Sequence, residues 1–214
     1  YLTPPIDDLW HNTIYLNEPN ITDDLTLYTT LAHEGYPGHL YQTVYSQSFL
    51  NQQNASCIRS MLHYGRFVEG WAVYVENLSY GYAAQLTKNE EAAAYIEACR
   101  LNRNLHLSLY CYMDIAIHND GATPEQIGRF LENLGLGQHT NVETIYEYLV
   151  EEPCNYLKYY LGYLEFLSLK QKAKELWGTD YSDYLFHKFV LETGPSDFRS
   201  LGEQLEKQNL GKQS

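Results

Sequence analysis

Residues 67–76 read FVEGWAVYVE, and two glutamates are the only charged side chains among them. The other positions are apolar, aromatic or glycine nearly all round a helix, which is typical of a helix buried in a protein core. Glu69 and Glu76 are seven residues apart, so they lie on nearly the same face of that helix. Because a buried carboxylate needs a compensating partner, we expect these glutamates to meet a metal ion or a basic side chain.

The rest of the chain reads as helices joined by short connections. The clearest start signal is a threonine cap followed by a proline and a capping-box glutamine at residues 123–126. Few runs alternate in hydrophobicity, and the sequence contains neither an internal repeat nor a glycine-rich phosphate loop. The sequence therefore predicts an all-α single domain, which begins with an irregular segment over 1–20. Six of the expected helices have both ends marked, at about 22–45, 56–79, 88–118, 123–134, 153–177 and 182–194. Two further helices are expected to begin near 140 and 196.

A second informative stretch, HEGYPGH, occupies residues 33–39. It resembles a lengthened HExxH motif, in which two histidines four residues apart face one zinc ion and the glutamate is the general base. Here the histidines are six residues apart, so a straight helix would point them about 120° away from each other. Pro37 lacks an amide donor and Gly38 tolerates unusual backbone angles, so a kink can bring His39 back toward His33. The alternative is a helix end that carries two incidental histidines.

Glu69 offers a third ligand to the two histidines. A His/His/Glu set with one open position for water is a known catalytic zinc arrangement, although the same donors also accept manganese or cobalt. In the alternative interpretation, Glu69 caps its helix or pairs with an arginine such as Arg66. We expect Glu76 to orient the ligating side chains rather than to bind the metal itself. The sequence thus predicts a Zn²⁺ site formed by His33, His39 and Glu69.

Several short stretches together point to one family. They are YLTPP (1–5), IYLN (14–17), HEGYPGH (33–39), EGWAVYVE (69–76), DIAIH (114–118), Tyr159, Gly162 and the stretch from Phe186-His187 to Gly194-Pro195. On these residues, the chain resembles the C-terminal part of the bacterial domain-of-unknown-function 885 family. The resemblance implies a helical zinc peptidase of the gluzincin type, with a kinked active-site helix and a peptide substrate. It also implies that residues 1–214 are the C-terminal catalytic domain of a longer protein, whose missing N-terminal domain completes the cleft. A chain that opens on Tyr1 rather than Met agrees with that expectation.

The resemblance also suggests further site residues. Tyr159 is the candidate phenol donor to the oxyanion, and His118 is the candidate that binds substrate or stabilises the tetrahedral intermediate. Asp114, four residues earlier, would orient an imidazole, and His187 is a candidate for substrate contact. Helical spacing alone leaves simpler interpretations open, namely an ordinary hydrogen bond between Asp114 and His118 and core packing for Tyr159.

The chain departs from the family pattern in two places. The family usually shows DxGxH followed by Gly-Trp, where this chain has Ala116 and then Gly121-Ala122. It usually shows Pro-Gly-Gln where this chain has Pro153-Cys154-Asn155. These differences leave the three predicted ligands intact and put the substrate-contact roles in question.

The predicted activity is metal-assisted hydrolysis of a peptide bond. Zinc lowers the pKa of its water to about 7, and Glu34, adjacent to a ligand, would take the proton as general base and deliver it to the leaving nitrogen. Two alternatives stay open. One is a metal-dependent amidohydrolase that acts on a non-peptide amide, and the other is a catalytically inactive binding or structural module.

Composition limits the partners. With 14 basic and 27 acidic residues the net charge is −13, which argues against nucleic acid or an anionic membrane surface as partner. No apolar run approaches the roughly 18 residues that a membrane span needs. The four cysteines show no CxxC spacing, so we expect neutral or buried thiols rather than zinc ligands. An acidic chain poor in lysine and arginine is compatible with bacterial secretion or surface attachment, which we favour over the cytoplasm.

Overall fold

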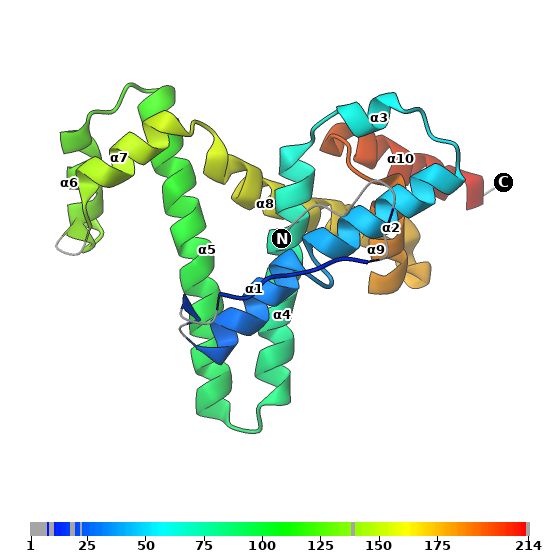
Figure 1. Ribbon diagram of the computed structural model, residues 1–214, viewed down its shortest axis with the longest axis horizontal. Helices are drawn as coiled ribbons and strands as arrows, with labels where there is room; N and C mark the ends of the chain where they lie inside the picture. The colour runs from blue at the N-terminus through cyan, green and yellow to red at the C-terminus, as the bar shows by residue number, and fades with distance from the viewer. Residues whose placement is uncertain (1–7, 9–10, 18–19, 22, 138–139, 213–214) are drawn as a thin grey trace.

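A computed structural model describes residues 8, 11–17, 20–21, 23–137 and 140–212, and every regular element in this part of the chain is helical. The all-α single domain is therefore confirmed for the described residues (Figure 1). Tyr1–Pro5 of the family resemblance and Thr22, at the expected start of the first helix, lie outside them. The helices are α1 (Asp24–Glu34), α2 (His39–Gln52), α3 (Ile58–Met61), α4 (Gly65–Leu86), α5 (Glu90–His118), α6 (Pro124–Asn133), α7 (Val142–Glu151), α8 (Asn155–Trp177), the 3-10 helix η3 (Gly178–Asp180), α9 (Asp183–Thr193) and α10 (Phe198–Lys212).

Helix α4 lies at the centre of the molecule and packs against α1, α5 and α8 (Figure 1). Its residues 67 and 70–77 are buried, as the apolar pattern of that segment predicts. Phe67, Trp71 and Tyr74 pack with Phe166 of α8 and Phe186 of α9 in the larger of two hydrophobic clusters. The helix that carries both glutamates is therefore the core helix, which holds their carboxylates in fixed positions.

The crossing of α4 and α8 depends on two glycines in direct contact. A Cβ atom added to Gly70 would lie 2.5 Å from the carbonyl carbon of Gly162, and one added to Gly162 would overlap the carbonyl oxygen of Arg66. The two backbones therefore touch, as only glycine permits. This close approach brings Tyr159, one turn before Gly162, toward the level of Glu69 on α4.

Two expected helix boundaries are wrong. The single helix predicted over 22–45 is two helices, because α1 ends at Glu34 and α2 begins only at His39. The helix predicted over 56–79 is split into short α3 and long α4, which continues to Leu86. Helix α4 pairs with α5, where the amides of Asn77 and Asn104 exchange hydrogen bonds of 2.8 and 3.2 Å. The capping box at the start of α6 is formed as predicted.

The far end of α5 forms a separate part of the fold. There α5 packs with α6 and α7, away from α1 and α2 (Figure 1), around a second hydrophobic cluster of Met113, Ile117, Ile127, Leu131 and Leu149. Among the described residues, no helix combines the length and the hydropathy that crossing a membrane requires.

Candidate metal centre

The two histidines of HEGYPGH lie on either side of a break between helices. His33 is in the last turn of α1, and His39 is the first residue of α2. A Cβ atom on Gly38 would overlap the carbonyl oxygen of His33, so glycine is required where the chain turns over the end of α1. Trp71 of α4 donates its indole N–H to the carbonyl oxygen of Pro37 at 3.0 Å. This hydrogen bond ties the connection to the core helix. Because α1 ends at Glu34 and α2 begins at His39, a break between two helices, rather than a kink within one, brings the two imidazoles together.

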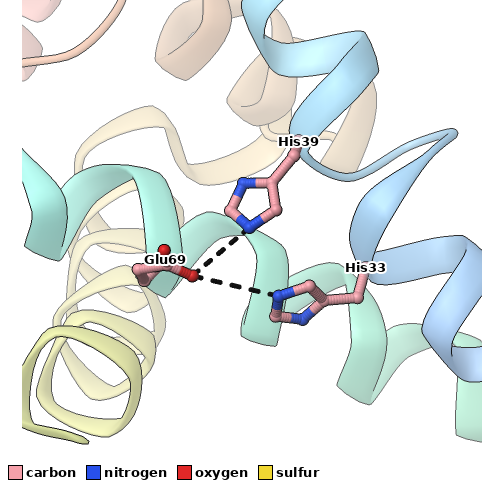
Figure 2. A group of neighbouring side chains, drawn as sticks. All are labelled: His33, His39 and Glu69. Atoms are coloured by element: carbon pink, nitrogen blue, oxygen red, sulfur yellow. Dashed lines mark ion pairs between the residues drawn. The ribbon is translucent and has the colours of Figure 1, made fainter. Parts of the chain in front are cut away.

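His33, His39 and Glu69 converge on one point (Figure 2). Glu69 Oε2 lies 3.3 Å from His39 Nε2 and 3.9 Å from His33 Nε2. The two rings meet edge to face, with their centroids 4.9 Å apart. Each residue offers one ligand atom, and the three atoms all lie within 4.8 Å of one another. Three donors from α1, α2 and α4 thus face a common volume.

The arrangement fits a zinc ion. Ligand atoms about 2.0–2.1 Å from a tetrahedral zinc are about 3.3 Å apart, and the two distances from Glu69 Oε2 to the histidine nitrogens meet or slightly exceed that value. Glu69 Oε2 is buried, yet it makes no hydrogen bond of good geometry, although a buried carboxylate oxygen requires a partner. The suggested pairing of Glu69 with Arg66 is not formed, because the guanidinium of Arg66 binds Glu165 at 3.2 Å. A cation among the three donors would bind this oxygen together with the two histidine nitrogens that face it.

Glu76 holds His33 from behind. Its Oε2 lies 2.9 Å from His33 Nδ1, and its Oε1 accepts a hydrogen bond of 2.9 Å from Arg103 Nε. Burial raises the pKa of Glu76, but the hydrogen bond with His33 and the charge of Arg103 outweigh it, and the net pKa is lowered. Because an ionised carboxylate only accepts, His33 Nδ1 is the donor, which leaves Nε2 unprotonated in the neutral ring. That nitrogen is the one that faces Glu69.

The pKa of Glu69 is also lowered. Burial raises it, but close contact with His39 and the charges of both histidines lower it further than burial raises it. Glu69 is therefore an anion, as a metal ligand must be.

A cavity of about 590 Å³ opens beside the triad, and His33, Glu34 and Tyr159 line it. The ring of Tyr159 stacks on that of His33 with centroids 6.4 Å apart. Burial, together with the negative charges of Glu69 and Glu34, raises the pKa of Tyr159 to about 12. Its phenol therefore stays protonated at neutral pH and can donate a hydrogen bond. The carboxylate of Glu34 and the phenol of Tyr159 thus line a cavity together with one of the candidate metal ligands, His33.

The family model described as "Bacterial protein of unknown function (DUF885)" matches residues 1–205. The chain belongs to this family. The match includes HEGYPGH and the segment 67–76, so the DUF885 family is confirmed on the motifs that suggested it. The description assigns the family no function.

Two solved structures resemble this DUF885 chain. One is a "putative lipoprotein" from Colwellia psychrerythraea, 26% identical over 88% of this chain with a TM-score of 0.69. The other is a "putative lipoprotein of unknown function" from Shewanella oneidensis, 26% identical over 86% of this chain with a TM-score of 0.67. The present chain spans 31% and 32% of their lengths. None of the curated proteins matches it.

The structure does not bring Asp114 and His118 to the triad of this DUF885 chain. His118 Nε2 lies 3.0 Å from the carbonyl oxygen of Leu149 and 3.8 Å from Asp114 Oδ1. Neither residue lines the cavity beside the triad. Their contacts are those of a local pair within one helix, and their roles at the reacting carbonyl stay predictions.

His187 borders a different cavity. Its Nε2 lies 2.8 Å from the hydroxyl of Tyr74, and its ring packs edge to face on Trp71. Burial and the charge of Lys170 lower the pKa of His187. The cavity it lines, of about 500 Å³, is bordered by Pro37 rather than by Glu34. A substrate contact by His187 would therefore take place on the other side of the HEGYPGH connection.

Sequence reasoning did not identify two residues that shape the site. Arg103 lies inside a long helix with no motif around it, and Trp71 reads simply as a core residue. The one available signal for Trp71 is its place on a helix expected to be buried, two residues after Glu69. A buried indole N–H needs an acceptor inside the protein.

Proposed function

We propose that this chain carries the catalytic metal centre of a zinc metallopeptidase. The observation that carries the proposal is the convergence of His33, His39 and Glu69, with a buried Glu69 oxygen that lacks a hydrogen bond. Two imidazoles and one carboxylate are the protein ligands of a catalytic rather than a structural zinc site, since they leave a position open.

In this proposal the protein residues have distinct roles. His33, His39 and Glu69 would hold the ion, which when bound supplies a Lewis acid that lowers the pKa of water and polarises a carbonyl. Glu34 follows His33 directly and lines the cleft, so its carboxylate is the candidate to take a proton from water and return it to the leaving nitrogen. Tyr159 is the candidate to donate its phenolic hydrogen to the carbonyl oxygen as negative charge develops there. Glu76 would keep His33 in the tautomer that binds metal.

The setting of the site is part of the proposal. The solved relatives are about three times as long as this chain, so we infer that a further region of the protein forms the opposite wall of the cleft. Because those relatives carry the name lipoprotein, we infer a location at the bacterial cell envelope. Residues 1–214 would then be the C-terminal catalytic domain.

Metal content is the first test. Elemental mass spectrometry on the purified chain is expected to find about one zinc ion per chain, and His33→Ala is expected to lose it. A chain that takes up no metal even when zinc is supplied would contradict the proposal and favour the non-enzymatic module.

Peptide cleavage is the second test. Glu34→Gln is expected to retain zinc and lose nearly all turnover, because the general base is removed and the ligands remain. Glu203→Gln on α10, whose carboxylate pairs with Arg199 on the surface, is the matched control and is expected to behave like the parent. Full activity of Glu34→Gln would contradict the assigned role. Zinc binding with no cleavage of any peptide would favour a non-peptide amide as substrate.

A further inference from the structure

The cleft beside Glu34 contains an arginine whose hydrogen-bonding capacity is largely unused. Arg103 lines the same cavity as His33, Glu34 and Tyr159. Its Nε donates to Glu76, and its side chain stays 38% exposed. Among the described residues, Arg103 has no other hydrogen bond or ion pair, so the four N–H groups on its two terminal nitrogens remain available.

We propose that Arg103 binds a carboxylate of the substrate, which makes this end of the cleft a subsite for an anionic group. The inference rests on the proposed peptidase function and adds a substrate class to it. A planar guanidinium binds a carboxylate through two parallel hydrogen bonds. Glu76 binds the guanidinium at Nε, so the two terminal nitrogens carry the N–H groups that would bind the carboxylate.

The distance limits where that carboxylate sits in a peptide. A single carboxylate, that of Glu76, separates Arg103 from His33 through two contacts of 2.9 Å. Arg103 Nε is therefore within about 8 Å of His33 Nδ1, which is the span of two to three extended residues at about 3.3–3.6 Å each. The candidate metal position lies about 4 Å further, across the ring and beyond Nε2, so the subsite selects a carboxylate within about four residues of the bond that is cut, as a free C-terminus or as an acidic side chain.

Among the residues that line the cavity, Arg103 is the cationic group, beside the carboxylates of Asp23, Glu34 and Glu76. Asp23, at the far end of the cavity, is engaged by the N–H and hydroxyl of Thr26 at the start of α1. His106, one turn beyond Arg103 on α5, lines the cavity as well and offers a further ring N–H.

Binding of short peptides to the zinc-loaded Glu34→Gln chain tests the inference without turnover. The three probes are acetyl-Ala-Ala-Ala as free acid, the same peptide as C-terminal amide, and acetyl-Ala-Ala-Asp amide, compared by isothermal titration calorimetry. At least about tenfold tighter binding is expected for a carboxylate probe than for the neutral amide, because only the carboxylate accepts charge-assisted hydrogen bonds from the guanidinium. Preference for the free acid would identify the C-terminus as the ligand, and preference for the Asp probe would identify an acidic side chain.

Two further variants assign the effect to Arg103. Arg103→Lys keeps a positive charge beside Glu76 but lacks the planar fork, and the preference is expected to fall to within about twofold. Arg100→Gln is the matched control, one turn away on α5. Its guanidinium binds Glu97 and Asn77 outside this cavity, so its preference should equal that of the parent.

Equal binding of acid and amide, no binding of either, or a preference that survives Arg103→Lys would each overturn the inference. Zinc content and melting temperature, measured on the same samples, report separately on the metal centre and on folding. A chain that fails as a metalloenzyme is thereby distinguished from one that merely lacks the carboxylate subsite.

Discussion

Replacement of Glu76 by glutamine is the sharpest test of how the centre is held together. The substitution keeps the size of the side chain and removes its negative charge. In the present structure Glu76 accepts from His33 Nδ1 and from Arg103 Nε, both at 2.9 Å. A glutamine offers one carbonyl oxygen and so satisfies one donor at most without rearrangement. The His33 ring then loses either its orientation or its preference for the metal-binding tautomer.

The expected loss of zinc affinity is about 10- to 100-fold, which is typical for removing a carboxylate that supports a ligating histidine. That range corresponds to about 1.4–2.7 kcal/mol. An independent estimate agrees, because one hydrogen bond to a charged group at this distance is worth about 1.5–3 kcal/mol. Loss of a ligand itself, as in Glu69→Ala, should be more severe, since it removes one of three donors.

Competition with a chromophoric chelator measures the zinc affinity directly, and circular dichroism confirms that the fold is intact. Glu97→Gln is the matched control, because Glu97 lies on the surface of α5 and pairs with Arg100 rather than with the centre. An unchanged zinc affinity in Glu76→Gln would refute the role of Glu76. So would an equal loss in the control.

Three further outcomes follow from the packing around the centre. Gly162→Ala should lower the free energy of unfolding in urea by more than about 2 kcal/mol, because its Cβ has no room between α4 and α8, whereas Gly81→Ala, with nothing within 4 Å, should be neutral or stabilising by up to about 1 kcal/mol. Trp71→Phe removes the indole donor to the HEGYPGH connection, and we expect a loss of about 2 kcal/mol in stability together with weaker zinc binding in the chelator assay. Burial and the charge of Asp114 raise the pKa of Cys111 to about 12, so little of its thiol is ionised at pH 8. Ellman's reagent at pH 8 should therefore modify exposed Cys57 and leave Cys111 unmodified until the protein is unfolded.

The core helix and its glutamates were predictable because their signal is local. An apolar surface all round residues 67–76 requires burial wherever the helix packs, and a buried carboxylate requires a partner in any fold. The capping box of α6 was predictable for the same reason, since all its hydrogen bonds lie within four residues. The HEGYPGH motif then indicated that histidines and a metal ion are the partners of these carboxylates.

What the sequence did not reveal depends on contacts between distant segments. The break at residues 35–38 needs the indole of Trp71 to anchor it, which a reading of HEGYPGH alone does not contain. Arg103 acquires its position only when α5 packs on α4 and meets Glu76. The roles of Asp114 and His118 stay predictions, because helical periodicity does not tell at which end of a long helix the cleft lies.

The seven-residue spacing on α4 explains why one histidine can be held so firmly. Glu69 and Glu76 share a helix face about 10.5 Å apart along the axis, and the end of α1 places the ring of His33 between them. One ring nitrogen faces the metal-side carboxylate at 3.9 Å and the other binds the supporting carboxylate at 2.9 Å. Because both carboxylates belong to the same buried helix, they cannot move independently, and the orientation of the imidazole is set by the most rigid element of the fold. His39, the first residue of α2, follows the connection that Gly38 and Trp71 shape, so the two histidines reach the site from separate helices.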